Sequence, residues 1–123
     1  MSATEQVARL RAAADLIEQR ASAASPGPWR AVEWYAGSLE VVDRAGAGIA
    51  TESSTGDVKM SDARWMAMLG PQVAAPLAAW LRAEADDADL IVAGNLVGGS
   101  AGKATTAAAL IVADVILAAQ ESR

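Results

Sequence analysis

Two prolines separated by one glycine interrupt the chain within residues 24–29, Ala-Ser-Pro-Gly-Pro-Trp. Pro26 and Pro28 lack a backbone N–H and disfavour the helical conformation in the residue before each of them, so no helix continues through both. Gly27 permits a sharp change of direction, and Trp29 supplies a large apolar surface with one N–H donor. The element therefore predicts the end of an N-terminal helix and the start of a different structure, and we interpret it as an organiser of the fold.

An amphipathic helix is predicted before this boundary. Ser2 and Glu5 have the spacing of a capping box, in which each side chain accepts a hydrogen bond from the backbone N–H of the other residue. Apolar residues then recur at spacings of three and four, at Val7, Leu10, Ala14, Ile17, Ala21 and Ala24. Because this stripe is narrow and ends in small alanines, it favours packing within its own domain over a coiled coil.

The sequence after Trp29 is typical of strands. Residues 29–35 and 39–43 predict a hairpin with a turn at Gly37-Ser38, and a second turn at residues 44–48 leads to a short third strand at 49–51. Three strands with one face against a helix form a stable minimum, whereas two are marginal.

Further helices are predicted beyond a polar loop at residues 52–57. The first has its N-cap at Ser61 or Asp62 and is closed by Gly70-Pro71. In the second, Pro76 begins the regular part or kinks it, and the helix either frays near its acidic residues or continues to Gly94. A loop at residues 94–102 and a helix at 105–120 follow. Trp65 and Trp80 lie on helical stripes and are predicted to be core residues.

Together these elements predict an α+β fold in a single domain, residues 1–123. It has an N-terminal helix, a two- or three-stranded antiparallel sheet and two or three further helices. A chain of this length has room for one core.

Composition excludes several classes of function. The chain has 15 acidic and 10 basic residues, for a formal net charge of −5, which argues against a nucleic-acid partner. It has no Cys and no His, so thiolate nucleophiles, imidazole bases and the usual zinc or copper ligands are missing. We therefore expect no enzymatic activity, no cofactor and no metal site.

The sequence also predicts a cytoplasmic protein. Residues 1–6 have neither the basic region nor the apolar region of a signal peptide. The longest nearly apolar run, residues 107–119, is interrupted by Asp114 and is shorter than the ~20 residues that a membrane span requires.

Three stretches in this order carry a resemblance to a known group of proteins. They are Ala24-Ser25-Pro26-Gly27-Pro28-Trp29, Asp62-Ala63-Arg64-Trp65-Met66-Ala67 and the helix beyond Pro71. Over residues 5–82 the chain resembles small phage-encoded accessory proteins, similar to the Ead-like early-region proteins of actinobacterial phages and prophages. These carry an A-T-P-G-P-W element, and Ser25 stands here where Thr is usual. The resemblance implies a phage accessory protein, working in the cytoplasm of an infected host cell, whose molecular activity is generally unassigned.

Two polar stretches are candidate ligand sites. Gly98-Gly99-Ser100-Ala101-Gly102-Lys103 is similar to a phosphate-binding loop, but three residues rather than four separate Gly98 from Gly102, and Ala104 rather than Ser or Thr follows Lys103. A simple helix connection is favoured, and an anion site using Lys103 is the alternative. The acidic residues Glu84, Asp86, Asp87 and Asp89 lack calcium-loop spacing, which favours a solvated helix end.

Aromatic residues near the hairpin are the candidates for binding a partner. Trp34 and Tyr35 are adjacent in a predicted strand, so their side chains should point to opposite faces, and only one face can meet the core. An exposed aromatic can anchor a protein or stack on a nucleobase, although a rim residue covering the hairpin is the simpler interpretation. The candidate binding residues are Trp29, Trp34, Tyr35 and Lys103.

The C-terminal helix predicts self-association. Residues 107–119 are apolar nearly all round, whereas a helix on the outside of a small monomer should have a polar face. We expect part of Leu110, Ile111, Val115 and Leu117 to meet a second copy, with a buried central helix in a monomer as the alternative.

The leading functional hypothesis is a non-enzymatic phage accessory protein that binds and modulates or sequesters a host component. The alternatives are a binder of a nucleotide-like signal, which would use Lys103, and a structural or assembly protein of the phage.

Overall fold

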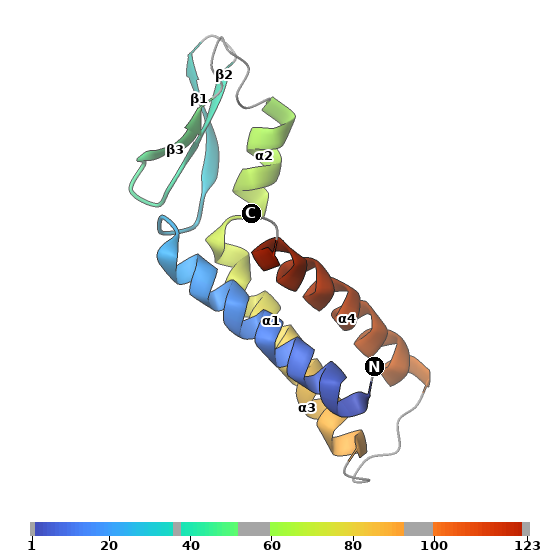
Figure 1. The fold of residues 1–123 in the computed structure, drawn as a ribbon. Helices are drawn as coiled ribbons and strands as arrows, with labels where there is room; N and C mark the ends of the chain where they lie inside the picture. The colour runs from blue at the N-terminus through green and yellow to red at the C-terminus, as the bar shows by residue number, and fades with distance from the viewer. Residues whose placement is uncertain (1, 36–37, 52–59, 93–99, 122–123) are drawn as a thin grey trace. The chain divides into compact units, whose positions relative to one another are not determined.

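The computed structural model describes residues 2–35, 38–51, 60–92 and 100–121. Their elements, in chain order, are α1 (Ala3–Ala23), β1 (Arg30–Tyr35), β2 (Ser38–Val42), β3 (Gly48–Thr51), α2 (Met60–Met68), a 3-10 turn (Pro71–Val73), α3 (Ala74–Val92) and α4 (Ser100–Glu121) (Figure 1). The predicted α+β class, with an N-terminal helix, an antiparallel sheet of three strands and further helices, is confirmed.

The chain divides into two compact units. The first comprises residues 1–19 and 75–123, and the second comprises residues 20–74. Each unit has its own cluster of buried apolar side chains. The expectation of a single domain over residues 1–123 stays a prediction.

The start of α1 follows the capping box that the sequence predicts. The backbone N–H of Ser2 donates to Oε2 of Glu5, and the backbone N–H of Glu5 donates to Oγ of Ser2, both at 3.1 Å. Two N–H groups at the helix start, which have no partner within the helix, are thereby satisfied.

The first unit is built from α1, α3 and α4 around a core that is rich in alanine. The fully buried residues of largest volume in this core are Leu10 and Leu81. Partly buried Trp80 packs against the same core, so its predicted core position is confirmed in part. Small side chains let the helices approach closely, and the buried set is Val7, Leu10, Ala13, Ala14, Ala78, Leu81, Ala85, Ala109 and Ala113.

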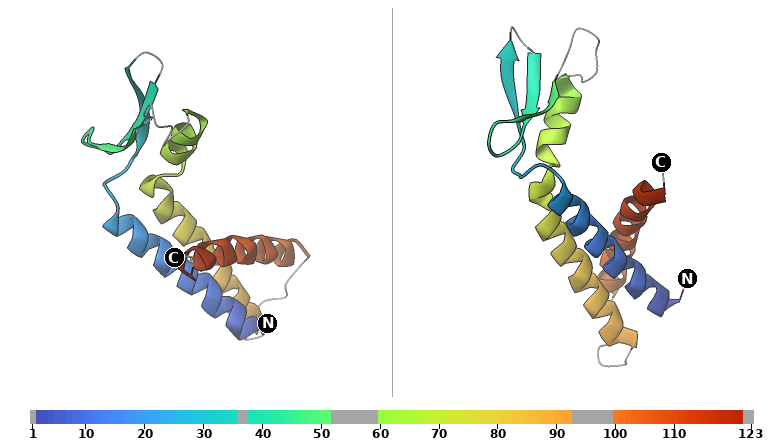
Figure 2. Two further views of the ribbon diagram at one scale, coloured as in Figure 1. Left: turned by 45° about the horizontal axis from the view of Figure 1, so that its top comes forward. Right: turned by 60° about the vertical axis from the view of Figure 1, so that its left-hand side comes forward.

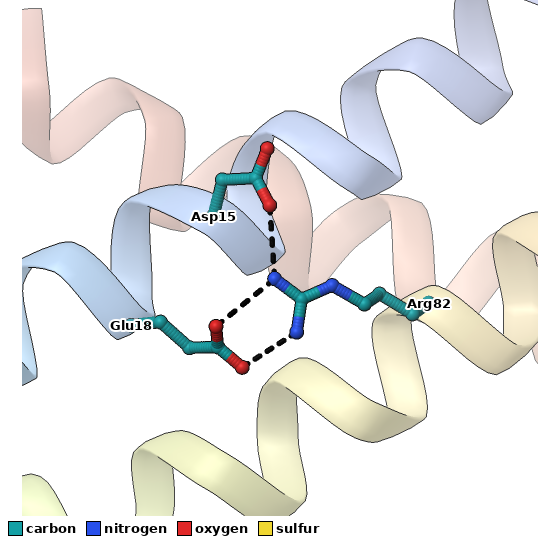
Figure 3. A network of polar contacts seen from close by, with 3 residues as sticks. All are labelled: Asp15, Glu18 and Arg82. Carbon is teal, nitrogen blue, oxygen red and sulfur yellow. Dashed lines mark hydrogen bonds and ion pairs between the residues drawn. The ribbon is translucent and has the colours of Figure 1, made fainter.

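Ion pairs show that α1 and α3 run antiparallel. Arg82 of α3 pairs with Asp15 at 2.9 Å and with Glu18 at 2.5 Å, as Figure 3 shows. One turn further back along α1, Arg11 pairs with Asp86 at 3.1 Å and with Asp89 at 3.4 Å. Higher residue numbers on α3 thus meet lower numbers on α1, and both views in Figure 2 show these two helices side by side.

The second unit is a three-stranded antiparallel sheet covered by α2. The strand order is β1-β2-β3, so β2 is central, and its Val41 is paired with Ala31 on one side and Ala50 on the other. Val41 is fully buried and forms a cluster with Leu39 and Ala63. Because Ala63 has only a methyl group, α2 can lie close to the sheet (Figure 2).

The turn between β2 and β3 is fixed by one carboxylate. Oδ1 of Asp43 accepts hydrogen bonds from the backbone N–H groups of Ala45, at 3.0 Å, and Ala47, at 2.9 Å. Gly46 adopts φ +89°, a left-handed conformation that favours glycine. The predicted second turn at residues 44–48 therefore forms as a tight connection, with Asp43 buried at its base.

Several predicted element boundaries were wrong. Helix α2 begins at Met60, so Ser61 and Asp62 lie inside it and neither is its N-cap. Pro71–Val73 forms a 3-10 turn before α3 (Ala74–Val92). Of the two predicted alternatives for the acidic end of α3, the structure has the continuing helix: Ala85 and Ala88 pack in the core of the first unit, and Arg11 of α1 pairs with Asp86 and Asp89. Ser38, predicted in a turn, begins β2.

The last helix also begins earlier than predicted, at Ser100 rather than Thr105. Residues 100–103 belong to α4, although the sequence predicted a loop over most of this stretch. The remainder of the predicted loop, at residues 94–99, lies outside the described residues, as do the predicted turn residue Gly37 and the whole of the predicted loop at 52–57.

Candidate interaction surfaces

The Trp29 turn is an organising element, as the sequence predicts. Trp29 is partly buried and packs against the cluster of Leu39, Val41 and Ala63 in its own unit. Its indole Nε1–H donates to the carbonyl oxygen of Ser25 at 2.8 Å, which closes the turn around the two prolines. The Trp29 side chain is therefore committed to packing and hydrogen bonding, which leaves only part of its surface for a partner.

Arg44 secures the same turn from the β2–β3 connection. Its Nε donates to the carbonyl oxygen of Gly27 at 2.6 Å, and its backbone N–H donates to the carbonyl oxygen of Pro26 at 2.9 Å. These contacts bind the proline element to the sheet that follows it.

Gln72 was not singled out by the sequence, yet it joins this turn to the end of α2. Its Oε1 accepts from the backbone N–H of Trp29 at 3.2 Å, and its Nε2 donates to the carbonyl oxygen of Ala67 at 2.6 Å. The approach is close, because a Cβ on Gly70 would lie only 3.0 Å from Cβ of Trp29. A glutamine far along the chain gives no local signal of such a role.

The other aromatic candidates cannot be placed on a surface. Trp34 and Tyr35 belong to β1, and the pairing register with β2 shifts between Glu33 and Tyr35. Their side chains lie outside what the structure describes. Lys103 lies within α4 rather than in a loop before it, and its side chain is likewise undescribed. Binding roles for these three residues stay predictions.

Three large apolar side chains at helical spacing are exposed on the outward face at the end of α2: Trp65 and Met68 lie in its last turn, and Leu69 follows directly, with its backbone N–H donating to the carbonyl oxygen of Trp65. Trp65 is 61% exposed, Met68 is 58% exposed and Leu69 is 48% exposed. The prediction that Trp65 is a core residue was therefore wrong. Ala63 is buried and Met66 is partly buried against the sheet cluster, and a helix turns by about 100° per residue, so Trp65 points away from that contact.

A second apolar surface lies on α4. Ile111 and Val115 are both 67% exposed, while Ala109 and Ala113 of the same helix are fully buried. Leu110 and Leu117 pack partly buried against the core of their own unit. The expectation that part of Leu110, Ile111, Val115 and Leu117 meets a second copy stays a prediction. Asp114 is exposed and pairs with Arg9 of α1 at 2.7 Å.

Several charged residues of the first unit pair with neighbouring helices. Hydrogen bonds from Arg82 lower the pKa of Glu18 below its ordinary value, and the carboxylates of Glu18 and Asp15 raise the pKa of Arg82. The pKa of Arg11 is raised chiefly by its hydrogen bond to Asp86. Glu84 accepts a hydrogen bond from Thr106 of α4. The acidic end of α3 is thus engaged with its neighbouring helices.

The described residues contain no group of three or more His, Cys, Asp or Glu side chains arranged to hold a metal ion. Over the same ranges, no helix has the length and apolar character needed to cross a bilayer. In that part of the chain every buried side-chain nitrogen or oxygen has a hydrogen-bond partner.

Comparisons with protein-family models, with curated proteins and with solved structures find no match to this chain.

Proposed function

We propose that this chain is a non-enzymatic accessory protein, of the phage-encoded kind that its sequence resembles, and that it acts by binding a host protein through the outward face of α2. The observation that supports the proposal is the exposure of Trp65 and Met68 in the last turn of α2 and of Leu69, the residue that follows it. Tryptophan and methionine are enriched in protein interfaces, and tryptophan is among the residues that most often dominate their binding energy.

The spacing of these residues indicates the shape of the partner. Positions i, i+3 and i+4 lie on one side of a helix, which is how an amphipathic helix presents its anchors to an apolar groove. The opposite side of α2, at Ala63 and Met66, packs against its own sheet. The helix is therefore already folded and held in place, so binding requires no ordering of the segment and the entropy cost is reduced.

Charge also bears on the choice of partner. Arg64 is exposed beside Trp65, on a chain whose formal net charge is −5. The proposed occupant is therefore a protein with an apolar groove, with a carboxylate near its rim to meet Arg64. Such a rim contact affects specificity and association rate more than affinity.

The test is affinity capture from lysates of an actinobacterial host with the wild-type chain and two variants. Trp65→Ala removes the proposed anchor, and Leu90→Ala is the control because Leu90 is an exposed apolar residue of the other unit, 41% exposed on α3. A protein retained by wild type and Leu90→Ala but lost with Trp65→Ala is the expected partner.

That partner is then purified and titrated against each chain. The expected result is a loss of affinity of about tenfold or more for Trp65→Ala, as for an interface residue that dominates binding, with little change for Leu90→Ala. If every captured protein binds wild type and Trp65→Ala equally, the α2 face is not the binding site and the proposal fails. Circular dichroism of both variants checks that the fold is retained.

A further inference from the structure

The described outward surface of α4 is almost entirely apolar. Among the side chains of residues 106–119, those that are exposed are Ala107, Ala108, Ile111, Asp114, Val115, Ala118 and Ala119. Only Asp114 among them is charged, and at about 100° per residue it lies at the edge of this arc, where it pairs with Arg9 of α1. An outer helix of a small protein usually presents a polar face to water.

The neighbouring helices expose more charge. The exposed residues of α1 include Arg11, Asp15 and Gln19, and those of α3 include Asp86, Asp87 and Asp89 beside the small residues Ala75, Ala79 and Ala83. The described part of α4 exposes one charged residue and two β-branched side chains, Ile111 and Val115, that are each 67% exposed.

The exposed apolar residues of α4 form a pattern that reads nearly the same in both directions. About Ala113 as the centre, Ile111 is matched by Val115, Ala108 by Ala118 and Ala107 by Ala119. A twofold interface uses the same patch on both copies and must be complementary to itself. From this symmetry we propose that two copies of the chain associate through α4, with their α4 helices antiparallel and the twofold axis passing beside Ala113.

Helix geometry defines the contacts in this arrangement. Ile111 of one copy lies level with Val115 of the other, and Ala108 lies level with Ala118, so the larger side chains meet at the centre and alanines flank them. Alanines allow a close interaxial distance, near the lower end of about 8–10 Å. The two Asp114–Arg9 ion pairs lie at the same edge of the interface, and each pair is neutral as a unit.

The size of the exposed apolar surface of α4 determines how strongly two copies are expected to associate. The seam from Ala107 to Ala119 is about 18 Å long at a rise of 1.5 Å per residue. A strip of this length that is no wider than one helix, about 10–12 Å across, covers less than the ~800 Å² per partner of a standard stable interface. Most of its side chains are also single methyl groups. The association should therefore be reversible, with a dissociation constant in the micromolar range or weaker.

Sedimentation equilibrium over about 10–500 µM measures this association for wild type, Val115→Glu and Leu90→Glu. Wild type should form a dimer as concentration rises, and a buried charge in Val115→Glu should increase the dissociation constant by about tenfold or more. Leu90→Glu, the same kind of change at an exposed apolar residue of α3, should associate like wild type. A wild-type chain that stays monomeric throughout, or a dimer unaffected by Val115→Glu, overturns the proposal.

Cysteine cross-linking tests the direction of the pairing, because the native chain has no cysteine. Chains carrying Ala108→Cys, mixed with chains carrying Ala118→Cys, should form a disulfide-linked pair under mild oxidation. Neither variant should cross-link to itself, because equivalent positions in an antiparallel pair lie about 15 Å apart along the axis, beyond the Cα–Cα reach of a disulfide of about 4.4–6.8 Å.

Cross-linking of Ala108→Cys chains to one another, or no cross-link in the mixture, contradicts the antiparallel arrangement. The residues tested on α4 are distinct from the α2 residues that carry the proposed function, so either proposal can fail while the other stands.

Discussion

The backbone N–H of Trp29 donates a hydrogen bond to the side-chain oxygen of Gln72, 43 residues later, at 3.2 Å. The side-chain amide of Gln72 also donates, from Nε2, to the carbonyl oxygen of Ala67 at 2.6 Å and to that of Met68 at 3.4 Å. One glutamine thus joins the proline turn before the sheet to the C-terminal end of the helix that covers the sheet.

Replacing Gln72 by alanine should lower the free energy of unfolding by about 1–3 kcal/mol, because partly buried groups lose their hydrogen-bond partner. Gln19→Ala, at an exposed position of α1, should change it by less than about 0.5 kcal/mol. Urea titration followed by circular dichroism measures both. Equal stability of the two variants would show that the Gln72 contacts contribute nothing.

Trp29 should be a stabilising residue, with a smaller effect than a fully buried tryptophan. Truncation of a core Trp to Ala costs about 3–5 kcal/mol, and since Trp29 is only partly buried we expect about 2–3 kcal/mol for Trp29→Ala. Trp29→Phe keeps most of the ring contact but loses the hydrogen bond to Ser25, for a loss of about 1 kcal/mol. Chemical denaturation measures the free energy of unfolding of both variants. A loss below about 1 kcal/mol for Trp29→Ala would place its side chain outside the cluster.

The close packing of the first unit predicts a sharp difference between two adjacent alanines. Ala78 is fully buried, whereas Ala79 is exposed on the same helix. Ala78→Leu should destabilise the chain by about 1–3 kcal/mol through overpacking. Ala79→Leu should stay within about 0.5 kcal/mol of wild type. Thermal unfolding at one protein concentration compares them, and similar melting temperatures would mean that the core accommodates the larger side chain.

The Arg82 network predicts a dependence of stability on pH. Because hydrogen bonds from Arg82 lower the pKa of Glu18 in the folded chain, its carboxylate stabilises the fold above the unfolded-state pKa, near 4.5. This contribution is lost as the pH falls through the lowered pKa of the folded state. Glu18→Gln should therefore reduce the melting temperature at pH 7 and show a smaller further decrease on acidification than wild type.

Asp87→Asn is the matched control, since Asp87 is an exposed carboxylate on α3. Its melting temperature should follow the wild-type dependence on pH. Because Arg82 and Glu18 lie near the surface, the effect should be small and should decrease with added salt. If the melting temperatures of Glu18→Gln and wild type depend on pH in the same way, the Arg82 network is not the source of the pH dependence of stability.

Local sequence determined the secondary structure and the start of the fold. The capping box of Ser2 and Glu5, the break at Pro26 and Pro28 and the strand-forming residues within 29–51 all depend on neighbours in the chain, and the capping box, the helix end and three strands formed as predicted. Such signals suffice because capping, proline geometry and strand propensity act over a few residues.

Only the tertiary structure decided which face of each element is covered. Trp65 and Met66 are equally apolar in sequence, but the sheet meets Met66, so Trp65 is exposed. The acidic end of α3 stays helical with Ala85 and Ala88 packed in the core of the first unit, and Arg11, 75 and 78 residues earlier in sequence, pairs there with Asp86 and Asp89. Gln72 acquires its role in the same way. Burial and pairing depend on which segments lie side by side, and a sequence pattern records only how residues are spaced along one segment.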